Sequence, residues 1–161
     1  MTLRAYRPSD LEILYQIDQA CFPSGVSYSR EEIAGFIGHR NSRTWVAEAE
    51  GGIVGFLIAA LMDDRTPQRA VHIITIDVVE AWRRRAVGDA LMGAAEEWAR
   101  ASRARTMSLE VAEDNVAAQA FYARRGYETV ERVEDYYANG MAAFVLQKQL
   151  TVNGPKLKVK G

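Results

Sequence analysis

The sequence predicts one α/β (α+β) domain built on a central, twisted, mixed and mostly antiparallel sheet. Apolar residues alternate in several short segments and recur with helical spacing in others, which gives the order βααβββαβαββ. A length of 161 residues is the usual size of one domain. The balance of 48% hydrophobic and 25% charged residues is typical of a folded protein. We therefore expect about seven strands flanked by four helices.

The individual elements follow from local patterns. Thr2–Arg7 alternates like a strand, and the helix after it opens at Pro8–Asp10 and ends at Phe22–Gly25. A second helix begins at Ser29, because Ser29 and Glu32 have the spacing of a capping box. Later helices are predicted at Asp89–Ala101 and Val116–Arg125. Further strands are predicted at Thr44–Glu50, Ile53–Met62, Ala70–Val79, Thr106–Val111, Tyr127–Glu134 and Met141–Leu150, and the third of these is rich enough in Ile and Val to be buried on both faces.

The composition argues against several classes of protein. A net charge of −1 gives no overall attraction to nucleic acid or to a membrane surface. The longest apolar run, about Ile53–Met62, is shorter than the roughly 20 residues that span a bilayer. Cys21 is the single cysteine, which suits a reducing, cytoplasmic compartment, and we expect no metal site. Residues 1–150 are expected to form the domain and residues 151–161 a basic, flexible tail.

The most informative segment is Arg83–Gly88, which joins a predicted strand to a predicted helix. A helix N-terminus presents free amides and the positive end of its dipole, and a tight loop of small residues lets those amides close on an anion. Arginines add bidentate donors for phosphate oxygens. The segment predicts a pyrophosphate-binding turn, although it has neither P-loop nor Gly-x-Gly-x-x-Gly spacing. A solvated arginine run is the alternative, and a nucleic-acid patch is less favoured because the run is short.

This turn resembles the acetyl-CoA signature of the GCN5-related N-acetyltransferase (GNAT) superfamily, Arg/Gln-x-x-Gly-x-Gly/Ala. The resemblance covers nearly all of Leu3–Leu150. It is similar to the branch that acetylates ribosomal-protein alanines and other protein N-termini (Nα-acetyltransferases). The matching positions continue through Leu109-Glu110-Val111, Asn115, Ala118, Phe121-Tyr122, Gly126-Tyr127, Asp135-Tyr136-Tyr137 and Val145-Leu146.

The resemblance implies a GNAT-like fold with acetyl-CoA as co-substrate and no metal. The sequence departs from the family pattern in two ways at the acetyl-CoA site. Ala86 replaces a motif glycine, which costs about 1 kcal/mol if φ is positive there. Acidic residues stand at Asp77, where a small residue is usual, and at Asp89, where a carboxylate repels pyrophosphate. The residues expected to bind the donor are Ile76, Asp77, Val78, Arg83, Arg84, Arg85, Ala86, Val87, Gly88, Asp89 and Asn115.

The resemblance also implies direct attack of an amine on the thioester. Glu110 matches the general base and Tyr122 the general acid. A glutamate is a weak base in water, so we expect a water molecule to relay the proton. An α-amine, with a pKa near 7.7–8.0, is more often neutral at pH 7 than a lysine near 10.4, so it is the easier acceptor. The alternatives are a Glu110 paired with an arginine and a Tyr122 that is an aromatic core residue.

Further positions are expected to contact the acceptor. Tyrosines offer flat apolar contact and a hydroxyl for a peptide backbone. Asn115 has a helix N-cap as its alternative role, and Cys21 is expected to be a buried core residue rather than a nucleophile. The expected substrate-binding residues are Phe22, Pro23, Tyr28, His72, Tyr136 and Tyr137, of which His72 is also a candidate second base.

Three functions are consistent with these patterns. The first is acetylation of a protein or peptide N-terminus, with a ribosome-associated protein as a possible acceptor. The second is the same chemistry on a lysine side chain, a polyamine or another small amine. The third is a non-catalytic module that binds acyl-CoA.

Overall fold

The structure is a computed structural model that describes residues 1–62 and 69–150. The expected tail at 151–161 lies outside the described residues. The helices are α1 (Leu11–Cys21), α2 (Arg30–Gly38), α3 (Val87–Ala101) and α4 (Val116–Arg124), with 3-10 turns at Pro8–Asp10 and Glu80–Trp82. The strands are β1 (Thr2–Ala5), β2 (Ser42–Ala49), β3 (Gly52–Met62), β4 (Ala70–Val78), β5 (Thr106–Ala112), β6 (Glu128–Val133) and β7 (Ala143–Gln149).

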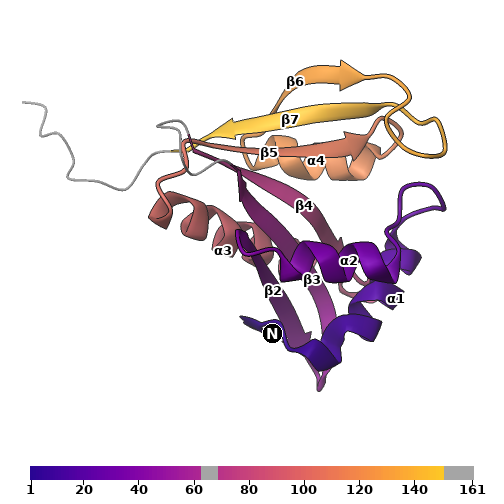
Figure 1. The fold of residues 1–161 in the computed structure, drawn as a ribbon, viewed down its shortest axis with the longest axis vertical. Coiled ribbons are helices and arrows are strands. Elements are labelled where there is room, and N and C mark those ends of the chain that lie inside the picture. Colours follow the sequence, from indigo (N-terminus) through magenta and orange to yellow (C-terminus); the bar gives the residue numbers. More distant parts are fainter. Residues whose placement is uncertain (63–68, 151–161) are drawn as a thin grey trace, which may run out of the picture.

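The seven strands form one mixed sheet in the order β1-β2-β3-β4-β5-β7-β6. Only β4 and β5 are parallel among the paired strands of the described sheet, and every other neighbouring pair is antiparallel. β4 and β5 meet at one end and diverge toward the other (Figure 1). The prediction of a mostly antiparallel seven-stranded sheet with four helices is confirmed, and the sheet is opened along its single parallel pair.

Two hydrophobic clusters hold the layers together. On one face, Leu14 and Ile17 of α1 and Ile33 of α2 pack on the inner strands through Val46, Phe56 and Ile58. On the other face, α3 buries Leu91, Met92 and Ala95 against a larger cluster that extends to α4. Figure 1 shows α1 and α2 lying across β3 and β4, with α3 behind these strands.

Local sequence signals account for several helix boundaries. The capping box of α2 forms as predicted: Ser29 accepts a hydrogen bond from the Glu32 amide, and Glu32 accepts one from the Ser29 amide. Gly126 follows α4 with φ +93°, a conformation that glycine adopts freely. α3 starts at Val87, two residues earlier than expected, because Ala86 ends the preceding loop in a left-handed conformation.

β4 differs from its prediction in a way that matters for the site. Its residues alternate between buried and half-buried, so it is not buried on both faces. A bulge at Ile74 separates Ile73, which pairs with Ala59, from Thr75, which pairs with Ile58. The bulge reverses the faces to which later β4 side chains point. Ile-rich sequence alone does not reveal that one edge of this strand is open.

Candidate active site

The centre of the site is the place where β4 and β5 separate. Their parallel register runs from Ala70 opposite Thr106 to His72 opposite Ser108, with no later pair among the described residues. Beyond His72 the backbone of β4 therefore presents an open edge toward the gap (Figure 1). An open strand edge can accept an extended ligand by main-chain hydrogen bonds.

Glu110 and His72 close the inner end of this gap. Glu110 lies two residues after the last β4–β5 pair, and its Oε1 is 2.7 Å from His72 Nε2. Both side chains remain partly exposed, at 20% and 28%. Among residues 1–62 and 69–150, Glu110 is thus paired with a histidine and not with an arginine, so a predicted catalytic residue lies beside a predicted substrate residue.

Three tyrosines that were predicted to bind the acceptor, Tyr28, Tyr136 and Tyr137, lie near Glu110. Burial raises the pKa of Tyr136 to about 12, and the negative charge of nearby Glu110 adds to this shift. Burial also raises the pKa of Tyr28 and Tyr137 well above the usual value, with further contributions from Tyr136 and Glu110. The Tyr136 and Tyr137 rings stack edge to face at 4.8 Å. At neutral pH all three phenols are protonated and can donate hydrogen bonds.

The tyrosines come from two loops that meet. We call residues 22–29, between α1 and α2, the substrate loop; it includes the predicted Phe22 and Pro23. The amide of Ala138, in the loop between β6 and β7, donates to the carbonyl of Gly25 at 3.2 Å. Gly25 has φ +91°, and a Cβ there would lie 2.7 Å from the Asn139 Cβ. Only a glycine allows this close approach.

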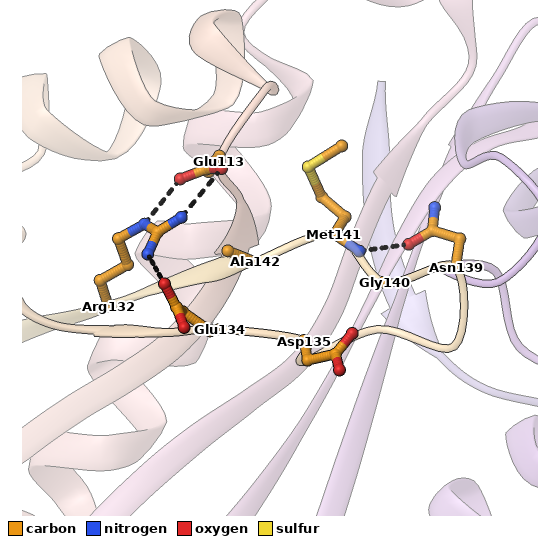
Figure 2. A pocket seen from close by; sticks show the side chains of 8 residues that line it. All are labelled: Glu113, Arg132, Glu134, Asp135, Asn139, Gly140, Met141 and Ala142. Carbon is orange, nitrogen blue, oxygen red and sulfur yellow. Dashed lines mark hydrogen bonds and ion pairs between the residues drawn. The ribbon is translucent and has the colours of Figure 1, made fainter.

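A pocket of about 450 Å³ lies under the loop between β6 and β7 (Figure 2). Arg132 joins Glu113 to Glu134, at 2.7 and 3.1 Å. Asn139 accepts a hydrogen bond from the Met141 amide at 2.9 Å, which shapes the loop beyond Tyr137. These contacts support the loop that carries Tyr136 and Tyr137.

The predicted pyrophosphate turn lies at the start of α3. Ala86 adopts φ +64° and Arg84 φ +61°, both in the left-handed region that disfavours side chains. Gly88 has a different reason to be glycine: a Cβ there would lie 3.2 Å from the Phe121 ring of α4. The first amides of α3 have no partner within the helix, as at any helix start. α3 and α4 approach each other closely at Gly88.

The arginines of this turn have different surroundings. The Arg83 Nε donates to the Val78 carbonyl at 3.1 Å, and one of its terminal nitrogens lies 3.5 Å from Cys21 Sγ. Arg85 lies over the Trp82 ring, 4.8 Å from its centre. All three arginines are exposed, but the Arg83 side chain is held by these contacts within the protein, whereas Arg85 rests on the Trp82 ring.

Several of the residues predicted to bind acetyl-CoA can offer only backbone atoms, and not side chains, to a ligand. Val87 is buried in the core beside Gly55, and the Asp77 side chain is buried against Asp18 of α1. Val78 already accepts hydrogen bonds from Arg83 and from Cys21 at 3.5 Å, which uses both lone pairs of its carbonyl. Ile76, another residue of β4 predicted to bind acetyl-CoA, is half-buried.

The negative charge of Asp89 is balanced by a cation that sequence reasoning missed. Arg125, just after α4, lies 3.0 Å from the Asp89 carboxylate. This ion pair reduces the repulsion that Asp89 would exert on a pyrophosphate at the start of α3. Sequence offers no local signal for it, because the two residues are 36 positions apart.

Tyr122 lies in α4, and Asn115 immediately precedes this helix. The Tyr122 side chain is buried, and burial together with the charge of Asp77 raises the pKa of its phenol well above the usual value. A higher pKa makes Tyr122 a weaker acid but leaves it a good hydrogen-bond donor. Asn115 caps α4, since its side-chain oxygen accepts from the Ala118 amide at 3.2 Å. Its NH₂ group is not used by that cap.

Replacing Ala86 by glycine is expected to raise the free energy of unfolding by about 0.5–1 kcal/mol, because glycine adopts positive φ without strain. Urea denaturation measures the change. Ala90→Gly is the matched control within α3, where the same substitution is expected to lower stability by about 0.5–1 kcal/mol. Equal effects at both positions would contradict the strain at Ala86.

The fold and the site together define a class of enzyme. A sheet opened at one parallel pair, a helix N-terminus at the mouth of the gap and a carboxylate at its inner end are typical of an N-acetyltransferase. Acetyl-CoA is the co-substrate of that class. Among residues 1–62 and 69–150, no group of three or more His, Cys, Asp or Glu side chains is arranged to hold a metal. No helix in the same part of the chain is long and apolar enough to cross a membrane.

Comparison with known proteins agrees with this class. Residues 11–127 match the acetyltransferase (GNAT) family. An uncharacterized N-acetyltransferase of Methanocaldococcus jannaschii is 29% identical over 96% of each chain, and an N-alpha-acetyltransferase of Sulfurisphaera tokodaii is 26% identical over 92% of each. The structure of Ard1 from Thermoplasma volcanium superimposes with a TM-score of 0.82 and 25% identity, covering 93% of this chain and 97% of that one. The chain belongs to the GNAT family and is an N-acetyltransferase.

Proposed function

We propose that this enzyme transfers the acetyl group of acetyl-CoA directly to the α-amino group of a protein or peptide N-terminus. The observation that carries the proposal is the position of Glu110, paired with His72 where β4 and β5 separate and surrounded by Tyr28, Tyr136 and Tyr137. The similarity to N-alpha-acetyltransferases supports the same acceptor. A cytoplasmic location and a ribosome-associated acceptor stay predictions from the sequence.

The donor would occupy the gap and the turn before α3. The α3 amides and Arg84 and Arg85 would bind the pyrophosphate. The Ile76 backbone and the Asn115 NH₂ group would bind the pantetheine arm, since Val78 and Asp77 are engaged elsewhere. The acetyl thioester would then lie near Glu110, at the inner end of the gap.

Acceptor chemistry needs a neutral amine beside the thioester. In this proposal Glu110, aligned by His72, takes a proton from the amine through a water molecule. Tyr122 donates a hydrogen bond to the departing sulfur, because its raised pKa makes charge stabilisation more favourable than full proton transfer. The phenols of Tyr28 and Tyr136 hold the amine end of the peptide.

The junction of the two loops favours a chain end over an internal lysine. Gly25 and Ala138 are joined by a backbone hydrogen bond beside the tyrosines, so the acceptor entrance is bridged. A peptide end can enter such an opening lengthwise. A lysine within a chain needs room for backbone on both sides of its side chain.

A peptide panel tests the proposal. We expect acetylation of peptides with free N-termini and none of N-terminally blocked peptides that contain lysine, measured by mass spectrometry with acetyl-CoA. The matched control is each peptide in its blocked form. Transfer confined to blocked peptides or polyamines would contradict the α-amine acceptor, and an absence of acetyl-CoA binding by calorimetry would contradict acetyl transfer altogether.

A further inference from the structure

Two carboxyl groups lie inside the protein between α1 and β4. Asp18 is 0% exposed and Asp77 is 1% exposed. Asp18 Oδ2 accepts a hydrogen bond from the Tyr28 amide at 2.7 Å, and Asp77 Oδ1 accepts one from the Thr75 hydroxyl at 2.5 Å. The other oxygen of each, Asp18 Oδ1 and Asp77 Oδ2, has no partner among the described residues.

A proton between the two groups resolves this arrangement. Two buried carboxylates repel each other, and burial disfavours charge on either one. A hydrogen bond between carboxyl groups requires that one of them is protonated. Burial, followed by the hydrogen bond to Asp18 and the charge of Asp18, raises the pKa of Asp77 well above its ordinary value. A single proton gives both remaining oxygens a partner.

We propose that Asp18 and Asp77 share one proton and act as positioning residues that fasten the substrate loop to β4. The loop is held at Tyr28, whose amide bonds Asp18 and whose hydroxyl lies 3.5 Å from the Ile74 carbonyl at the β4 bulge. Tyr28 also packs edge to face on Phe36 of α2 at 4.9 Å. That this loop serves the acceptor rests on the proposed function.

Three further titratable or charged side chains, from α1, α4 and the segment after β4, surround Asp18 and Asp77. From α1, Cys21 faces Asp77, and burial together with the Asp77 charge raises the pKa of that thiol. From α4, Tyr122 is affected by the same charge. Arg83, in the segment after β4, is the cation that acts on Asp77 and lowers its pKa in part. Loss of the shared proton would place two adjacent negative charges beside one cation.

The effect on stability has a definite sign. The folded chain keeps the Asp77 proton at pH values where the unfolded chain has released it. Stability from this group is therefore greatest below the ordinary aspartate range, and it falls as the pH rises toward the pKa of Asp77 in the folded state. As the pH approaches the pKa of Asp77 in the folded state, the two carboxylates repel each other. The substrate loop then loosens and the KM for the acceptor peptide rises.

Asp77→Asn tests the shared proton. The amide of Asn would donate permanently to Asp18, while its oxygen would still accept from Thr75. We expect the variant to be more stable than the natural protein, and the difference in their free energies of unfolding to increase from about pH 5 to about pH 8. Urea denaturation measures this difference. The peptide KM of the variant is expected to stay constant over the same pH values. A difference in free energy of unfolding that does not change with pH would overturn the proposal.

Asp10→Asn is the control with the opposite sign. Asp10 is also buried, but a hydrogen bond from Arg4 lowers its pKa. The folded chain gains stability from its carboxylate above the ordinary aspartate range. This variant is therefore expected to lose stability relative to the natural protein as the pH rises from acid to neutral.

Asp18→Ala tests the positioning role. Without the Asp18 acceptor, amide hydrogen exchange at Tyr28 is expected to accelerate and the peptide KM to rise about tenfold, whereas Asp18→Asn should restore both. Unchanged exchange at Tyr28 would overturn the positioning role. If no peptide is acetylated by the natural enzyme, the proposed function fails, but the urea and exchange measurements still decide whether the pair exists and holds the loop.

Discussion

Replacing Glu110 by glutamine is expected to lower kcat by about 10²- to 10⁴-fold, the usual contribution of a general base. Glutamine has nearly the same shape, and its oxygen can still contact His72, which now lies 2.7 Å from the Glu110 carboxylate. What it loses is the ability to take a proton from the amine. The KM for acetyl-CoA should change little, because Glu110 lies at the inner end of the gap and not at the turn before α3, which is proposed to bind the pyrophosphate. Steady-state kinetics with a free N-terminal peptide measures both constants.

Glu131→Gln is the matched control for this variant. Glu131 is an exposed glutamate on β6, so it undergoes the same chemical change outside the site. Its kcat is expected to stay within about twofold of the natural enzyme. A Glu110→Gln enzyme with natural kcat at all pH values would remove Glu110 from the mechanism and leave His72 as the candidate base.

Replacing Glu96 by alanine is expected to lower the free energy of unfolding by about 3–5 kcal/mol. Glu96 is 3% exposed and receives hydrogen bonds from Arg125 and the Tyr127 hydroxyl, each at 2.9 Å. Lys148 of β7 lies 3.3 Å from the same carboxylate. Removal of the Glu96 carboxylate would leave two partly buried cations, Arg125 and Lys148, without the anion that they share. Urea denaturation at neutral pH measures the loss.

Glu97→Ala provides the comparison, because it makes the same change one residue later in α3. The Glu97 side chain is 74% exposed and lies 4.0 Å from Arg100. Exposed ion pairs contribute little, so a change below about 0.5 kcal/mol is expected. Losses of similar size at both positions would mean that the helix, and not the buried network, determines the effect.

Sequence reasoning succeeded where the physics is local. The capping box at Ser29 and Glu32 depends on groups three residues apart, and it forms as predicted. The Arg83–Gly88 segment was predicted to lead into a helix, and α3 does begin within it. Its role as a pyrophosphate-binding turn stays a prediction. The family resemblance added Glu110 and the tyrosines, which the structure brings together.

The remaining features depend on contacts between distant segments. Asp18 lies on the apolar face of α1, one turn after Leu14, and this position was the available sign that it is buried. Its partner Asp77 could not be inferred, because the bulge at Ile74 decides which face of β4 Asp77 occupies. The hydrogen bond from the Arg83 side chain to the Val78 carbonyl also had no signal in the sequence. The role of Arg83 at the cofactor stays a prediction.

The glycine at position 25 also limits how this enzyme can diverge. Any side chain there would collide with Asn139, so the substrate loop and the loop between β6 and β7 cannot change independently. A new acceptor preference that requires a bulkier residue at position 25 first needs a compensating change near Asn139. Variation in these two loops should therefore be inherited as linked pairs of substitutions, and libraries that diversify one loop alone should yield mostly inactive enzymes.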